Sequence, residues 1–171
     1  MKKLAFTLLL VAISFATASA QKFALVDMEY ILRNVPSYEM ANEQLNQVSL
    51  RWENEVNEVS KEAETMYKNY QSDMVFLTDD QKKKREEEIV AKEKEATDLR
   101  YKYFGPEGEL YKKRQSLMEP IQNDIYEAIK KLCDEKGYQV IFDRASSAGI
   151  IFASPRIDVS NEVLSKLGYS K

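Results

Sequence analysis

The chain has 171 residues, a net charge of −3, one cysteine and no histidine. The absence of histidine removes the commonest general base and metal ligand, and no glycine-rich phosphate loop of the GxxxxGK(S/T) kind occurs. The many carboxylates stand beside lysines along predicted helices, as on solvated helix faces. We therefore expect no enzyme, no cofactor and no metal site, and the acidic balance argues against nucleic acid as a partner.

The first twenty residues have the pattern of a secretory signal. Lys2 and Lys3 precede an apolar run at 4–15, and small residues follow at 18–20. The run is too short to span a bilayer as a stable helix, so an uncleaved anchor is the less favoured alternative. We expect an exported mature chain that begins at Gln21, without stable membrane insertion. Without the two lysines it has 23 basic and 28 acidic residues, a net charge of −5.

A short strand and a short helix are predicted next. Residues 23–26 are apolar and predict a strand, and Asp27 is a good N-cap for a helix over 28–33. The residue before Pro36 is driven out of the helical region, which ends this helix. We expect Ser37 to cap the long helix that follows.

Residues 37–132 predict two long helices that fold back on each other around 78–81, where Thr78 or Asp79 can cap the returning helix. Apolar residues recur in steps of three and four, which is the period of a seam between packed helices. On the first helix these are Leu45, Val48, Trp52, Val56, Val59, Ala63, Met66, Tyr70, Met74 and Leu77. On the second they are Ile89, Ala96, Leu99, Tyr103, Leu110, Leu117, Ile121, Ile125, Ala128 and Leu132.

Two features should disturb the returning helix. Gly105, Pro106 and Gly108 predict a kink or a break, and Pro120 a further bend. A flexible hinge and a fixed irregularity are both compatible with the residues at 104–108. The basic block at 82–85 is followed by acids, and we favour a solvated face with ion pairs over a site for an acidic partner.

Several large apolar side chains lie off the seam. Such side chains, spaced along a polar rod, suit weak contacts with apolar segments of other proteins, and we assign them to client binding. The alternative is packing against a neighbouring subunit, or no role at all. The set is Tyr67, Val75, Phe76, Tyr101, Phe104, Tyr111 and Met118.

The C-terminal part changes character. Gly137 predicts a helix stop, 138–142 and 150–153 predict two strands of an antiparallel hairpin, and 157–167 predicts a last helix, which Asp158 or Ser160 caps. So few strands are not stable alone, which argues for an oligomer. The residues assigned to oligomerisation are Phe23, Leu25, Val140, Phe142, Ile150 and Phe152.

The order of these features resembles the Skp/OmpH-like family of periplasmic chaperones. The resemblance covers nearly the whole mature chain and is most specific in the tail. It rests on the signal, Phe23-Ala24-Leu25-Val26-Asp27, the charged hairpin, Ile125-Tyr126-Glu127-Ala128-Ile129, Glu135-Lys136-Gly137-Tyr138, Val140-Ile141-Phe142-Asp143, Ile150-Ile151-Phe152-Ala153 and Ile157-Asp158-Val159-Ser160.

The resemblance implies an α+β fold, mostly α, in which a long antiparallel helical hairpin stands on a small β body that both chain ends form and trimerisation completes. The expected division is a signal at 1–20, a trimerisation body at 21–36 and 133–171, and a hairpin arm at 37–132. The implied function is an ATP-independent periplasmic holdase that keeps unfolded outer-membrane β-barrel proteins in a cavity between the arms of a homotrimer.

One departure from the family concerns charge. Well-known members have strongly basic arms, whereas 37–132 holds 16 basic and 21 acidic residues, a net charge of −5. We therefore do not expect a broad electrostatic attraction to anionic lipid or acidic clients, and we expect holding to depend on apolar contact and enclosure. The family's lipopolysaccharide site is not carried over, because its residues have no match in this sequence. The alternative function is a non-enzymatic coiled-coil adaptor or structural protein of the cell envelope.

Overall fold

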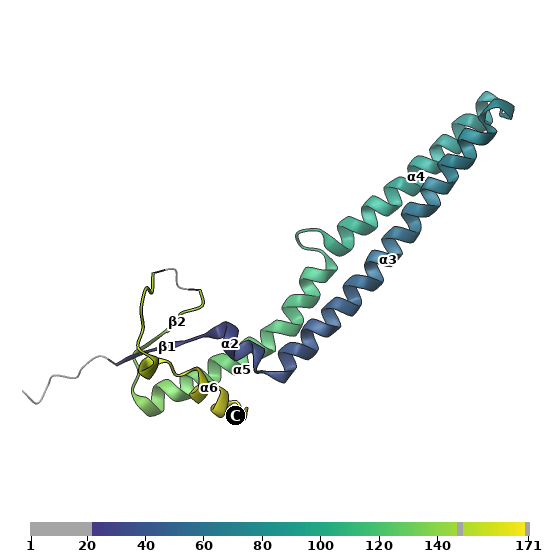
Figure 1. Ribbon diagram of the computed structural model, residues 1–171. Coiled ribbons are helices and arrows are strands. Elements are labelled where there is room, and N and C mark those ends of the chain that lie inside the picture. The colour runs from purple at the N-terminus through teal and green to yellow at the C-terminus, as the bar shows by residue number, and fades with distance from the viewer. Residues whose placement is uncertain (1–21, 147–148, 170–171) are drawn as a thin grey trace, which may run out of the picture. The chain divides into compact units, whose positions relative to one another are not determined.

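The computed structural model describes residues 22–146 and 149–169, so the predicted signal at 1–20 lies outside the described residues. The described chain is mostly helical and contains one small sheet (Figure 1), which confirms the predicted α+β fold class. It divides into two compact units: a hairpin unit at 35–124, and a body unit that combines 22–34 with the described residues from 125 onward.

The hairpin unit contains α3 (Pro36–Asp73), the 3₁₀ turn η1 (Met74–Phe76), α4 (Asp79–Phe104) and the first half of α5 (Glu109–Lys136). Helices α3 and α4 lie side by side and antiparallel (Figure 1). Thr78 caps α4: its Oγ1 accepts from the Gln81 N–H, and the Gln81 side chain accepts from the Thr78 N–H in return.

The predicted Ser37 cap of α3 is wrong. The helix begins one residue earlier, at Pro36, with Val35 in the N-cap position and no side-chain cap. Proline suits the first helical position because its fixed φ is helical and its missing N–H would have lacked a helical partner there in any case.

The predicted seam contains every buried residue of α3 and α4 except Ala41, which precedes its first position at Leu45. Met74 belongs to the predicted seam but is exposed: the helix tightens into η1 there, and the change in period turns the side chain away from α4. The buried residues are Ala41, Leu45, Val56, Ala63 and Tyr70 on α3, with Ile89, Ala96 and Tyr103 on α4.

The interruption predicted at 104–108 is a break between two helices. A Cβ on Gly105 would lie 2.4 Å from the Tyr101 carbonyl oxygen, and one on Gly108 would lie 2.7 Å from that of Tyr103. Both positions therefore require glycine. Helix α5 continues through Pro120, so that proline does not end the helix.

The body unit contains β1 (Phe23–Val26), α2 (Met28–Arg33), the second half of α5, β2 (Val140–Asp143), the 3₁₀ turn η2 (Pro155–Ile157) and α6 (Ser160–Lys166). Gly137 ends α5 with φ +72°, as predicted, and the Tyr138 N–H closes the turn on the Cys133 carbonyl. The largest fully buried side chains of this unit are Ile31, Ile125, Leu132, Val159 and Val163.

The predicted antiparallel pairing of 138–142 with 150–153 is wrong. Strand β2 pairs in parallel with β1 from the other end of the chain, with Phe23 opposite Val140 and Val26 opposite Asp143. The residues at 150–153 lie in no strand, and Leu25 instead forms a single bridge with Asp158. Two segments about 115 residues apart thus form the sheet, a pairing that no local pattern indicates.

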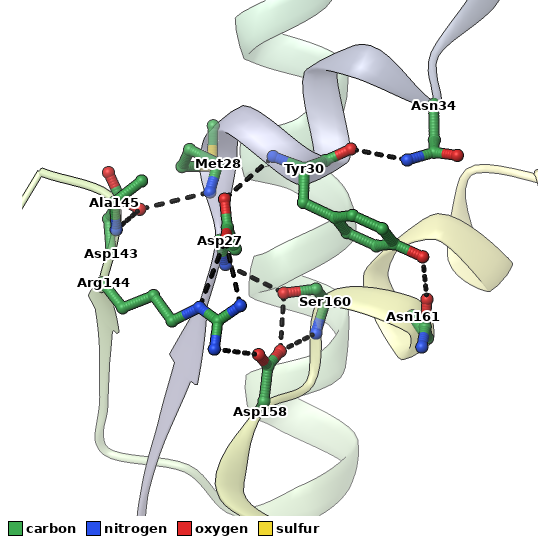
Figure 2. Close-up of polar contacts among 10 residues, drawn as sticks. All are labelled: Asp27, Met28, Tyr30, Asn34, Asp143, Arg144, Ala145, Asp158, Ser160 and Asn161. Atoms are coloured by element: carbon green, nitrogen blue, oxygen red, sulfur yellow. Dashed lines mark hydrogen bonds and ion pairs between the residues drawn. The ribbon is translucent and has the colours of Figure 1, made fainter. Parts of the chain in front are cut away.

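Polar contacts at the end of the sheet tie these segments together (Figure 2). The Asp27 carboxylate caps α2 by accepting from the Tyr30 N–H at 2.8 Å, as predicted. Arg144 donates to the Asp27 Oδ2 at 3.1 Å and pairs with the Asp158 Oδ2 at 3.3 Å. The Ser160 Oγ accepts from the Asp27 N–H and donates to Asp158.

The last helix begins later than predicted. Helix α6 starts at Ser160, with Val159 in the N-cap position, because 155–157 forms η2 instead. The Asp158 carboxylate still accepts from the Ser160 N–H at 2.9 Å, so it satisfies one of the free donors at this helix start without occupying the cap position.

Candidate functional site

The turn between α3 and α4 exposes two apolar side chains that were assigned to binding. Val75 is 81% and Phe76 87% exposed in η1, and Met74 beside them is also exposed. Both residues stand in the three-residue turn η1, and α4 begins only at Asp79. Neither side chain therefore lies in the seam between α3 and α4. The described chain therefore presents an apolar cluster at this turn, among acidic and basic neighbours.

Three tyrosines from the predicted set lie exposed on the helices of the hairpin unit. Tyr67 stands on α3, Tyr101 on α4 and Tyr111 on α5, and Tyr101 is the most exposed of them at 72%. Gln71 donates to the Tyr67 hydroxyl at 3.0 Å and Gln115 to the Tyr111 hydroxyl at 2.9 Å, both one turn onward. Each of these two rings is therefore held along its own helix.

The remaining two predicted residues, Phe104 and Met118, are half-buried. Phe104 packs edge-on against Tyr103, with ring centroids 6.4 Å apart. Its ring therefore contributes partly to the packing at the end of α4 and offers less surface for binding than Tyr101.

Sequence reasoning missed exposed aliphatic side chains on the same helices. Leu50 on α3, Val90 on α4 and Met40 near the start of α3 are each about 60% exposed, less than Tyr101 but more than Tyr67 and Tyr111. The sequence pattern could have identified them. Leu50 stands two residues after Val48 and Val90 directly follows Ile89, which places both off the seam.

Two tyrosines hold the helices of the hairpin together through carboxylates. Tyr103 is buried and stacks flat on Trp52, with centroids 4.7 Å apart, and its hydroxyl donates to the Glu55 carboxylate at 2.9 Å. Tyr70 donates in the same way to Glu86. The carboxylate acceptor raises the pKa of each tyrosine, so both hydroxyls stay protonated donors.

The body unit has a separate apolar surface. A groove of about 690 Å³ is lined almost entirely by apolar side chains of the sheet and of 149–157. Among the residues assigned to oligomerisation, Leu25 is buried and Ile150 half-buried, whereas Phe23, Val140, Phe142 and Phe152 are exposed. Ile151, which was not in that set, is fully exposed.

Within residues 22–146 and 149–169, no cluster of three or more ligating side chains could hold a metal ion. None of the helices in this part of the chain combines the length and the apolar character that a bilayer crossing requires.

A family model and a solved structure match the chain. The family model for "Outer membrane protein (OmpH-like)" matches residues 22–167. A crystal structure described as an OmpH-like outer membrane chaperone from Caulobacter crescentus has the same fold, with a TM-score of 0.72 over 87% of this chain and 85% of that one, at 11% identity. No curated protein matches the chain in sequence.

Proposed function

The chain belongs to the OmpH-like family, which supports a chaperone role, and on that premise we propose that it is a periplasmic holdase for unfolded outer-membrane β-barrel proteins. The observation that carries the proposal is the row of exposed apolar side chains on an otherwise charged helical hairpin, with Val75, Phe76 and Tyr101 the most exposed of the predicted set. Exposed apolar surface of this kind marks a protein-binding site.

Binding of unfolded proteins to this surface requires no nucleotide. The sequence contains no phosphate-binding loop, and the exposed aromatic and aliphatic side chains offer apolar contact that is not specific to one sequence. Because the hairpin is acidic, we propose that apolar contact and enclosure, rather than charge attraction, provide the affinity.

The body unit is proposed to form a homotrimer. A two-stranded sheet is marginal alone. Its exposed Phe23 and Phe142, together with Phe152 from the segment that follows the sheet, line the apolar groove of the same unit. A neighbouring copy that covered this surface would remove it from water and join the sheets of the copies at their open edges. The helical hairpins of three copies would then enclose one client.

The first test is the light-scattering mass of the mature chain, residues 21–171, alone and mixed with a urea-unfolded porin. We expect the mass of three subunits alone, and that mass increased by one porin in the mixture without ATP. Loss of the porin as aggregate beside an unchanged trimer would contradict the holdase. It would favour the adaptor, which binds one folded partner at a fixed stoichiometry.

The second test removes aromatic rings from the hairpin. Changing Tyr67, Phe104 and Tyr111 to Ser should weaken porin binding at least about tenfold, because aromatic anchors contribute on the order of 1 kcal/mol or more each. The matched control is Tyr126→Ser, which removes an exposed ring from the body unit and should leave binding unchanged. Equal affinity of the triple variant and the wild type would exclude these rings from the binding surface.

A further inference from the structure

A groove of about 550 Å³ opens along the hairpin where both helices place an alanine in the seam. Ala63 of α3 and Ala96 of α4 are buried and line it. Elsewhere the seam carries larger side chains, such as Val56, Tyr70 and Ile89. Because alanine is too short to fill the same space, the two helices leave a hollow with a methyl floor between them.

The walls of the groove are less polar than their composition suggests. The Ser60 hydroxyl donates to the Val56 carbonyl at 2.9 Å, and that of Thr97 donates to the Glu93 carbonyl at 3.0 Å. Both hydroxyl groups therefore donate to backbone carbonyls of their own helix and not into the groove. Tyr67 forms part of one wall, and Gln71 holds its hydroxyl along α3.

One guanidinium and two carboxylates also line the groove. Arg100 takes part in none of the ion pairs of the described residues, whereas Glu64 is bound by Lys68 at 2.5 Å. Glu93 adds a second carboxylate. Two carboxylates beside one guanidinium disfavour a phosphate or a free carboxylate as the ligand. A guanidinium and a tyrosine ring over an apolar floor instead suit a flat, neutral aromatic ring.

We propose that this groove binds an aromatic side chain of an unfolded client, an inference that rests on the proposed holdase function. The ring lies on the methyl groups of Ala63 and Ala96, with the Tyr67 ring and the Arg100 guanidinium against its faces or edges. The volume lies within the range of small-ligand pockets, about 300–1,000 Å³. Unfolded β-barrel membrane proteins supply such rings, because their strands carry girdles of aromatic residues.

The direct test uses alanine methyl NMR on the mature chain, residues 21–171, titrated with a short polar peptide that contains one Trp. We expect ring-current shifts at the Ala63 and Ala96 methyl signals. The peptide with Leu in place of Trp should bind about two- to fivefold more weakly, since cation–π contacts are worth about 0.5–1 kcal/mol. With Asp in that place no binding should be detected.

Three results would overturn the assignment. Unmoved Ala63 and Ala96 signals at saturation with the Trp peptide would show that the ring binds elsewhere. Equal affinity for the Leu peptide would identify an unselective apolar groove. Binding of the Asp peptide through Arg100 would identify an anion site.

Filling the groove gives an independent test. Ala96→Leu should weaken Trp-peptide binding at least about tenfold, since burial of an aromatic side chain is worth about 1.5–3 kcal/mol. The matched control, Ala91→Leu, makes the same change at an exposed position of α4 and should bind as the wild type does. If circular dichroism shows lost helix in Ala96→Leu, Arg100→Gln takes its place, with about a threefold loss expected.

The outcomes separate this inference from the holdase proposal. Suppressed porin aggregation with silent Ala63 and Ala96 signals would refute the groove and leave the holdase in place. Shifted methyl signals without any suppression of aggregation would refute the holdase and leave an aromatic-binding groove.

Discussion

The hairpin unit and the body unit bury their apolar side chains in different ways. In the hairpin, one residue in three or four enters a seam between two helices, and the rest of each helix surface faces water. In the body, short segments from both ends of the chain surround one cluster, which contains the five largest fully buried side chains. The hairpin therefore depends on many small local contacts, and the body on a few that require the whole unit.

This difference determines how each unit responds to a change in its packing. If the packing between the helices is interrupted at one turn, the other turns of the seam stay packed. The hairpin can therefore tolerate the small pair Ala63 and Ala96 and the break at 104–108. A cluster built from segments about 115 residues apart loses its closing contacts together. Four predictions test that contrast.

Leu132→Ala should have the largest effect. Leu132 is 1% exposed, and truncation of such a core leucine costs about 2–5 kcal/mol. We expect the whole body unit to unfold at lower denaturant, as measured by hydrogen exchange of β1 and β2. The control is Leu50→Ala on the exposed face of α3, which should change stability by less than about 0.5 kcal/mol. If Leu132→Ala and Leu50→Ala lost the same unfolding free energy, the body would not depend on its buried cluster as we infer.

Trp52→Ala should cost less, about 2–3 kcal/mol. Trp52 is only half-buried, so the full loss for a buried aromatic side chain, about 3–5 kcal/mol, does not apply, although its stacking on Tyr103 is lost. Exchange should rise in α3 and α4 near the stack and stay unchanged in the body. A protection pattern like that of the wild type would mean that the stack contributes nothing.

Gly108→Ala should cost about 1–2 kcal/mol. The added Cβ would meet backbone atoms of Tyr103, Gly105 and Lys102 at under 3.0 Å, so the break must shift. The control is Gly149→Ala, where nothing lies within 4 Å of the new Cβ. We would measure both by thermal unfolding. A neutral Gly108→Ala would show that the break is mobile rather than a fixed turn.

Acid should weaken the body by the smallest amount, through protonation of Asp27. The Tyr30 N–H, and then Arg144, hold the pKa of Asp27 below its usual value against the opposing effects of burial and of the Asp143 charge. A lowered native pKa stabilises the fold above the unfolded-state value, about 3.9, and this stabilisation is lost as the pH falls towards the native value.

The matched variant for this effect is Asp27→Asn, which keeps a side chain that can cap α2 but removes the charge. Its unfolding free energy should fall less steeply than that of the wild type as the pH is lowered through this range. Parallel curves for the two proteins would assign the acid sensitivity to other groups.

Sequence reasoning succeeded where the cause is local. The apolar seam, the reversal at Thr78, the break after Phe104 and the helix end at Gly137 each follow from residues within a few turns of one another. It failed at Ser37 and Met74, where a proline start and a 3₁₀ turn changed the local geometry by one residue or a fraction of a turn. For the candidate site, the off-seam tyrosines were identifiable because the seam itself was clear.

The amino-acid sequence by itself determined the helical hairpin, because a helix is built from contacts three and four residues apart and its caps lie next to its ends. Only the tertiary structure decided that β1 pairs in parallel with β2, that Arg144 joins Asp27 to Asp158, and that two alanines leave a groove beside Tyr67. These features join segments from different helices or opposite ends of the chain. Many pairings of short apolar segments have similar local energies, and the packing of the complete unit selects among them.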